Sequence, residues 1–145
     1  MDDIKQKAKE RGQRLRLPYA GALLPAEAHA LMQQGAKLVD VRTDAELQYV
    51  GSIPGSETVE WNNYPEGARN PEFLEQLADA VEKDEPVMFI CRSGARSHHA
   101  AVAATQAGWR EAYNVLEGFE GDKDADGHRN TVGGWKFARL PWIQG

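Results

Sequence analysis

The sequence has little of several features that mark particular classes of protein. It has a single cysteine, so an intramolecular disulfide is excluded. Residues 1–16 are polar and lack the apolar stretch of a secretory signal, and we therefore expect a cytoplasmic protein with a reduced thiol. No segment approaches the roughly 20 apolar residues that a membrane helix requires, so we expect no membrane partner.

Basic charge is also scarce over most of the chain. The 145 residues include 17 basic and 22 acidic side chains, a formal net charge of −5, which argues against nucleic acid as a partner. Basic side chains are in excess only near the start, and we predict that residues 1–20 form a polar arm, solvated or frayed. Docking of this arm to an acidic partner is the alternative. Residues 21–145 are predicted to form one domain with a C-terminal extension.

Helical and strand patterns alternate along that domain. Apolar spacing and caps predict helices over residues 25–35, 43–50, 70–81 and 97–107. Short apolar runs predict strands over residues 37–41, within 51–61, and over 86–91 and 112–116. Alternation of this kind predicts an α/β fold with a central, mostly parallel sheet and helices on both faces.

The only cysteine, Cys91, follows the most apolar predicted strand, and ligands of such sheets bind beyond the strand ends. A free thiol is mostly protonated at neutral pH, and the protonated form is a poor nucleophile. Three features favour a thiolate here: the charges of Arg92 and Arg96, a helix that begins near Ser97, and a loop whose backbone can curl at Gly94. A structural cysteine beside a surface turn is the alternative.

Four segments, in order, resemble the rhodanese (sulfurtransferase) homology family, specifically its single-domain members. The similarity covers about residues 23–121, and its segments are LVDVRTDAEL (38–47), GSIPGS (51–56), CRSGARS (91–97) and YNVLEGFEG (113–121). The resemblance implies a rhodanese-like fold and transfer of sulfane sulfur through a persulfide on Cys91. The implied donor is a small anion such as thiosulfate, and the implied acceptor is cyanide, a thiol or a protein thiol. No metal or organic cofactor is implied.

The resemblance also implies roles for the residues around the cysteine. Arg92 and Arg96 would hold the anionic donor. The persulfide would lie among backbone amides, those of Arg92, Ser93, Gly94, Ala95, Arg96 and Ser97. Asp40, Arg42 and Glu46 are predicted to form one structural network behind the site.

Alternative functions remain at this point. Dual-specificity phosphatases resemble this fold, but their loop places five residues between cysteine and arginine, whereas four separate Cys91 from Arg96. The mercaptopyruvate branch is disfavoured because its loop lacks the double arginine. A persulfide carrier or binding module for a protein partner stays open.

The histidines, several aromatic residues and an acidic segment outside the four similar segments also allow predictions. His98 and His99 are expected in a solvated helical turn, and Trp61 and Tyr64 either wall the pocket or pack in the core. The acidic segment 121–133 begins like an EF-hand loop, with Asp122, Asp124 and Asp126, but has Gly133 in place of the final glutamate. We expect a polar surface loop there, with weak calcium binding as the alternative. Trp135 and Trp142 of the extension are expected to cover an apolar patch.

Overall fold

The structure is a computed structural model that describes residues 2–63 and 67–144. Its centre is a five-stranded, all-parallel sheet in the order β1-β5-β4-β2-β3. The strands are β1 (Gly21–Leu23), β2 (Lys37–Asp40), β3 (Glu57–Thr58), β4 (Val87–Ile90) and β5 (Ala112–Val115). The predicted parallel sheet is confirmed, and β1 is a strand that the sequence patterns did not indicate.

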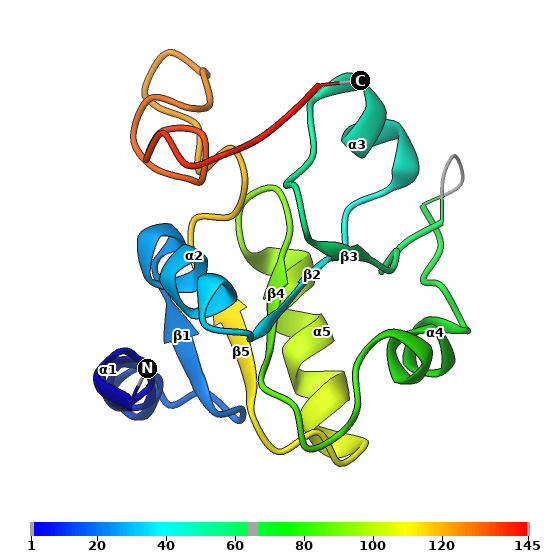
Figure 1. Cartoon of the computed structure of the whole chain (residues 1–145). Coiled ribbons are helices and arrows are strands. Elements are labelled where there is room, and N and C mark those ends of the chain that lie inside the picture. The colour runs from blue at the N-terminus through cyan, green and yellow to red at the C-terminus, as the bar shows by residue number, and fades with distance from the viewer. Residues whose placement is uncertain (1, 64–66, 145) are drawn as a thin grey trace.

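Within residues 2–63 and 67–144, five helices lie around the sheet, as Figure 1 shows. They are α1 (Asp2–Arg14), α2 (Pro25–Gln33), α3 (Asp44–Tyr49), α4 (Phe73–Ala80) and α5 (Ala95–Gln106). Helix α4 begins later than predicted, because the Asn70 side chain accepts a hydrogen bond from the Glu72 amide and closes a turn before the helix. Helix α5 begins earlier, because Gly94 adopts φ +114° and serves as its N-cap.

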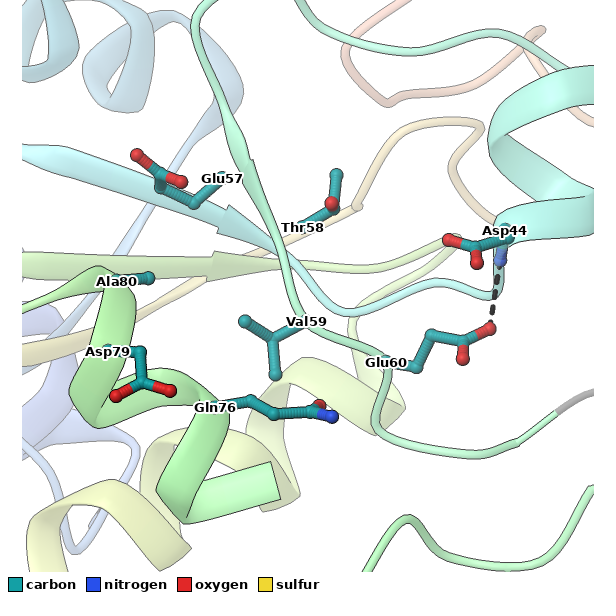
Figure 2. A pocket seen from close by; sticks show the side chains of 8 residues that line it. All are labelled: Asp44, Glu57, Thr58, Val59, Glu60, Gln76, Asp79 and Ala80. Atoms are coloured by element: carbon teal, nitrogen blue, oxygen red, sulfur yellow. Dashed lines mark hydrogen bonds between the residues drawn. The ribbon is translucent and has the colours of Figure 1, made fainter. Parts of the chain in front are cut away.

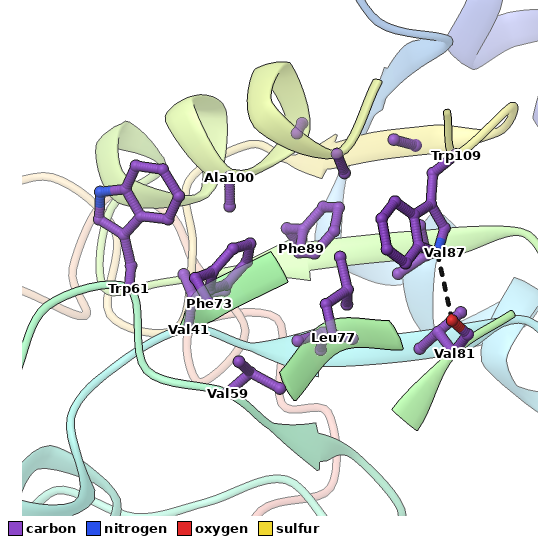
Figure 3. Close-up of a cluster of buried hydrophobic side chains, with 14 of the residues drawn as sticks. Val41, Val59, Trp61, Phe73, Leu77, Val81, Val87, Phe89, Ala100 and Trp109 are labelled. Carbon is purple, nitrogen blue, oxygen red and sulfur yellow. Dashed lines mark hydrogen bonds between the residues drawn. The ribbon is translucent and has the colours of Figure 1, made fainter. Parts of the chain in front are cut away.

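The central strand β4 is buried on both faces, and its side chains alternate between two apolar clusters. Val87 and Phe89 pack with α4 and α5 in the first cluster, where Figure 3 shows Phe73 and Leu77 opposite the sheet. Met88 and Ile90 belong to the second cluster, with residues of α1, α2 and the C-terminal extension. A strand enclosed in this way holds the residue that follows it in a fixed position.

Helix α1 differs from the expected polar arm, because one of its faces packs closely on the edge strand β1. Ala8 is fully buried, and a Cβ atom on Gly21 would lie 2.6 Å from the Ala8 carbonyl carbon. A Cβ on Gly12 would lie 3.0 Å from the Gly21 Cα, so three small residues permit the contact. Arg11 then reaches Glu27 of α2 at 2.8 Å, which ties α1 to the second apolar cluster.

The C-terminal extension returns across the molecule to end beside α3 (Figure 1). Trp135 is fully buried in the second cluster, and Trp142 packs edge-on against Phe119. Ile143 pairs with Ser52 in an antiparallel bridge. The expectation that both tryptophans cover an apolar patch is confirmed.

Among the helices of residues 2–63 and 67–144, none combines the length and the apolar character that crossing a membrane requires.

Candidate active site

Cys91 lies directly after β4, at the start of a tight loop that leads into α5. Its residue is 1% exposed, and its sulfur accepts the Gly94 N–H at 3.1 Å. The Ser97 hydroxyl, from the first turn of α5, lies 3.3 Å from the same sulfur. The loop thus curls around the sulfur atom, as the sequence predicted, and places it at the positive end of a twelve-residue helix.

The carbonyl groups at the beginning of this loop point away from the sulfur. The Cys91 carbonyl accepts the Phe119 N–H at 2.7 Å, and the Arg92 carbonyl accepts the Glu120 N–H at 3.0 Å. This contact requires glycine at Gly118, which has φ +66° and whose added Cβ would lie 2.5 Å from the Arg92 carbonyl carbon. The first amides of a helix have no acceptor within the helix, so the first turn of α5 has N–H groups available for an anion, and the Gly94 N–H already bonds the sulfur.

Arg96 forms a two-pronged ion pair with Glu46, which comes from α3. The two nitrogen–oxygen distances are 2.6 and 2.8 Å, and about a quarter of each side chain is exposed. Burial alone would raise the pKa of Glu46, but the hydrogen bonds and charge of Arg96 outweigh it and lower the pKa to about 2. The same contacts raise the pKa of Arg96. Arg96 therefore already has an anionic partner at the edge of the loop.

The local sequence explains why Glu46 is available to Arg96. Thr43 caps α3 through its side chain, and the Glu46 carboxylate accepts the Thr43 N–H at 3.1 Å. This predicted capping box fixes the glutamate at the first turn of α3, facing the loop that carries Arg96.

The other candidate anion-binding residues differ in their exposure. Arg92 and Ala95 are exposed, whereas Ser93 and Gly94 are partly exposed and Ser97 is buried. Of the two arginines, Arg92 is therefore free to meet a ligand from solvent, whereas Arg96 is partly buried and already paired with Glu46.

Asp40 and Arg42 form a second ion pair, which is sealed from water. Both side chains are 0% exposed, and the closest nitrogen–oxygen distance is 2.8 Å. Arg42 also donates to the Gly51 carbonyl and lies over the Phe119 ring, 4.1 Å from its centroid. The three residues predicted to form a structural network thus fall into two pairs: Asp40 bonds Arg42, and Glu46 bonds Arg96 of α5.

Asn114 is a buried site residue that the sequence analysis missed. It lies on β5 and is 3% exposed, and its Oδ1 atom is 2.5 Å from the Ser97 hydroxyl oxygen. Its Nδ2 atom donates to the Gly94 carbonyl at 3.3 Å. A polar asparagine inside an otherwise apolar strand was the available signal.

The two histidines after the loop differ from each other. His98 Nδ1 is 2.7 Å from the Tyr19 hydroxyl, and burial, aided by the neighbouring His99, lowers the pKa of His98. His99 is exposed. The expected solvated turn describes His99 but not the hydrogen-bonded His98.

A hollow of about 520 Å³ lies between β3, α4 and the start of α3, away from the cysteine loop (Figure 2). Glu60 accepts the Asp44 amide there at 2.9 Å. Its lining carries four carboxylates, those of Asp44, Glu57, Glu60 and Asp79. Such a lining repels an anionic sulfur donor, so the hollow is no substitute for the loop as a donor site.

The acidic segment after β5 uses its central carboxylate internally. Asp124 accepts the amides of Asp126 and His128, both at 2.9 Å, and the Thr131 hydroxyl at 2.7 Å. Within residues 2–63 and 67–144, no group of three or more histidine, cysteine or acidic side chains is arranged to hold a metal ion.

Of the two aromatic residues weighed as pocket walls, Trp61 packs edge-on against Phe73 in the first apolar cluster. Tyr64 lies outside the described residues.

The chain is similar to several known proteins. Thiosulfate sulfurtransferase GlpE of Haemophilus influenzae is 31% identical over 102 residues, which cover 68% of this chain and 84% of the relative. An uncharacterized protein of Rickettsia prowazekii is 33% identical over 114 residues, 77% of this chain and 86% of the relative. The crystal structure of Rv0390 from M. tuberculosis superposes with a TM-score of 0.80 at 44% identity, covering 88% of this chain and 99% of that one.

Residues 24–125 also match the family model described as the rhodanese-like domain, which spans most of the chain and includes the loop at Cys91. The chain belongs to the rhodanese family.

Proposed function

We propose that the protein is a sulfurtransferase that moves sulfane sulfur from thiosulfate, or a related small anionic donor, to a thiophilic acceptor through a Cys91 persulfide. The observation that carries the proposal is the loop itself: the sulfur accepts the Gly94 N–H at 3.1 Å, while the Cys91 and Arg92 carbonyls are bonded to residues 119–121. The similarity to thiosulfate sulfurtransferases supports the choice of reaction.

The reaction proceeds in two displacements. The Cys91 thiolate attacks the outer sulfur of thiosulfate, a new S–S bond forms, and the original S–S bond breaks so that sulfite leaves with the electron pair. Cyanide or a thiolate then attacks the outer sulfur of the persulfide, and the cysteine thiolate is regenerated. Once the Cys91 thiolate has formed, neither displacement transfers a proton, so neither requires a general base, a metal ion or an organic cofactor.

The charges around the loop suit an anionic donor. Arg92 is exposed at the opening, and Arg96 can exchange part of its bonding from Glu46 to the donor. A donor would therefore compete with the Glu46 carboxylate for one guanidinium group.

The burial of Cys91 limits the first step to a small donor. A persulfide places its outer sulfur about 2 Å beyond the cysteine sulfur, the length of one S–S bond. The same extension would let a larger acceptor, including a protein thiol, reach the transferred atom. The proposed reaction also needs a reduced cysteine, which a cytoplasmic location would supply.

The direct experiment is incubation of the protein with thiosulfate, followed by intact-mass measurement. We expect a gain of one sulfur atom that is discharged by cyanide and is not seen in Cys91→Ser. An unmodified wild-type protein after incubation with thiosulfate contradicts the proposal.

Steady-state rates separate the remaining alternatives. Thiosulfate with cyanide should be turned over much faster than mercaptopyruvate or an aryl phosphate. A protein that acquires sulfur but passes it to cyanide only slowly would instead be a persulfide carrier for a protein partner.

A further inference from the structure

The hydrogen bonds around Ser97 determine which way its hydroxyl proton points. Three acceptors compete for that proton: Asn114 Oδ1 at 2.5 Å, the Gly94 carbonyl at 3.2 Å and the Cys91 sulfur at 3.3 Å. A hydroxyl has one proton, and the shortest of these contacts is with Asn114. Ser97 therefore presents a lone pair, not a proton, to the sulfur.

The orientation of the Asn114 amide is fixed by its other contact. The Gly94 carbonyl is only an acceptor, so the amide nitrogen of Asn114 must face it, as the 3.3 Å contact shows. The amide oxygen then faces Ser97. Both Asn114 and Ser97 are buried, at 3% and 0% exposure, so water does not compete for these bonds.

We propose that Asn114 is a positioning residue that withholds the Ser97 proton from Cys91. In the resting protein the Cys91 thiol donates to the Ser97 oxygen, and the Ser97 hydroxyl donates to Asn114. When the Cys91 sulfur carries negative charge, as a thiolate, it must draw the Ser97 proton away from Asn114. Asn114 thus sets how readily the sulfur becomes anionic and how tightly the loop holds the anion.

A role of Asn114 in catalysis rests on the proposed function, but the test of its effect on Cys91 does not. Alkylation of Cys91 by iodoacetamide requires a thiolate and does not require sulfur transfer. The pH dependence of the alkylation rate therefore reports the effect of Asn114 even in a protein that never receives sulfur from thiosulfate.

The decisive variant is Asn114→Ala, in which Ser97 is free to donate to an anionic sulfur. A hydrogen bond to a charged group is strong enough to move the midpoint of the alkylation profile by about one pH unit. We expect that shift to be toward lower pH. With thiosulfate, the same variant should pass its persulfide sulfur to cyanide faster, because a more stable Cys91 thiolate is a better leaving group.

A second variant shows that the effect passes through Ser97. In a Ser97→Ala background, Asn114→Ala should leave the alkylation midpoint unchanged, because no hydroxyl proton remains to redirect. Thr105→Val is the matched control: it removes a hydroxyl of the same helix that has no hydrogen-bond partner among the described residues, and it should leave the profile unchanged.

Circular dichroism confirms that each variant is folded before its profile is measured. A folded Asn114→Ala protein with the wild-type midpoint overturns the inference. The same shift in the presence and absence of Ser97 also overturns it, since Asn114 would then act by another route. Failure of thiosulfate to load the wild-type protein contradicts the proposed function alone.

Discussion

The two arginine–carboxylate pairs near the cysteine loop have similar geometry but different access to water. The side chains of Asp40 and Arg42 are 0% exposed, whereas those of Glu46 and Arg96 are 23% and 24% exposed. Separating a fully buried pair leaves an uncompensated charge in the protein, which costs several kcal/mol. A pair in contact with water separates far more easily. The first pair is therefore suited to a fixed structural role, and the second to exchange with an anionic ligand.

The largest expected effect comes from breaking the buried pair. Asp40→Asn keeps the size of the side chain but leaves Arg42 buried without its counter-charge, and we expect the free energy of unfolding to fall by about 3–5 kcal/mol. Urea denaturation measures the loss. Replacing both residues together, with Asp40→Leu and Arg42→Met, should recover much of it. A loss below about 1 kcal/mol for Asp40→Asn would show that the pair is not sealed from water.

Changing the exposed arginine should alter ligand binding more than stability. Arg96→Lys keeps the charge but loses the planar two-pronged contact, so the KM for thiosulfate should rise about tenfold. The free energy of unfolding should change by less than about 1 kcal/mol. Steady-state kinetics measure the KM, and urea denaturation of the same sample measures the free energy of unfolding. An unchanged KM would remove Arg96 from the proposed donor site.

Removing the competing carboxylate should have the opposite effect on KM. Glu46→Gln can still cap α3, because glutamine also serves at this position of a capping box. The variant leaves Arg96 without its anionic partner, and we expect the KM for thiosulfate to fall by about three- to fivefold, on the scale of a surface ion pair. A KM that rises would indicate that Glu46 orients Arg96 for the donor rather than competing with it.

The smallest effect is the pH dependence of the exposed pair. The pKa of Glu46 is lowered from 4.5 to about 2, so the contribution of the pair is fully present above about pH 4.5 and is lost as the pH falls through about 2. The difference in stability between wild type and Glu46→Gln should therefore be constant from pH 7 to about pH 4.5, and should shrink below it. Urea denaturation midpoints of both proteins, measured from pH 7 downward, give this difference. A difference that already changes between pH 7 and 5 would contradict the lowered pKa.

The sequence predicted those parts of the fold that depend on neighbours along the chain. The capping box of Thr43 and Glu46 was recognisable because its two residues are three positions apart. The position of Cys91 at a strand end followed from the apolar run before it and the glycine after it. In contrast, β1 has only three residues and no β-branched side chain, so its pairing with β5 gave no local pattern.

The contacts that were not predicted join residues far apart in the sequence. Glu46 and Arg96 are 50 positions apart, and Ser97 and Asn114 are 17 apart, so only the folded sheet brings them together. The prediction that residues 1–20 form a solvated arm was wrong for a similar reason. Its basic composition indicated a solvated segment, but Ala8 and Gly12 form a narrow strip of small residues whose partner, Gly21, is known only from the structure.

The backbone contacts of Cys91 and Arg92 with residues 119–121 bear on how this protein could be redesigned. Because those carbonyls are already bonded elsewhere, the main chain of the loop supports the proposed preference for anions alongside the charges of Arg92 and Arg96. Exchanging Arg92, Ser93 or Ala95 can change which anion fits and which acceptor approaches. Converting the loop to accept cations would require rebuilding the glycine turn at Gly118, so the sign of the ligand's charge is much less open to evolution or engineering than its identity.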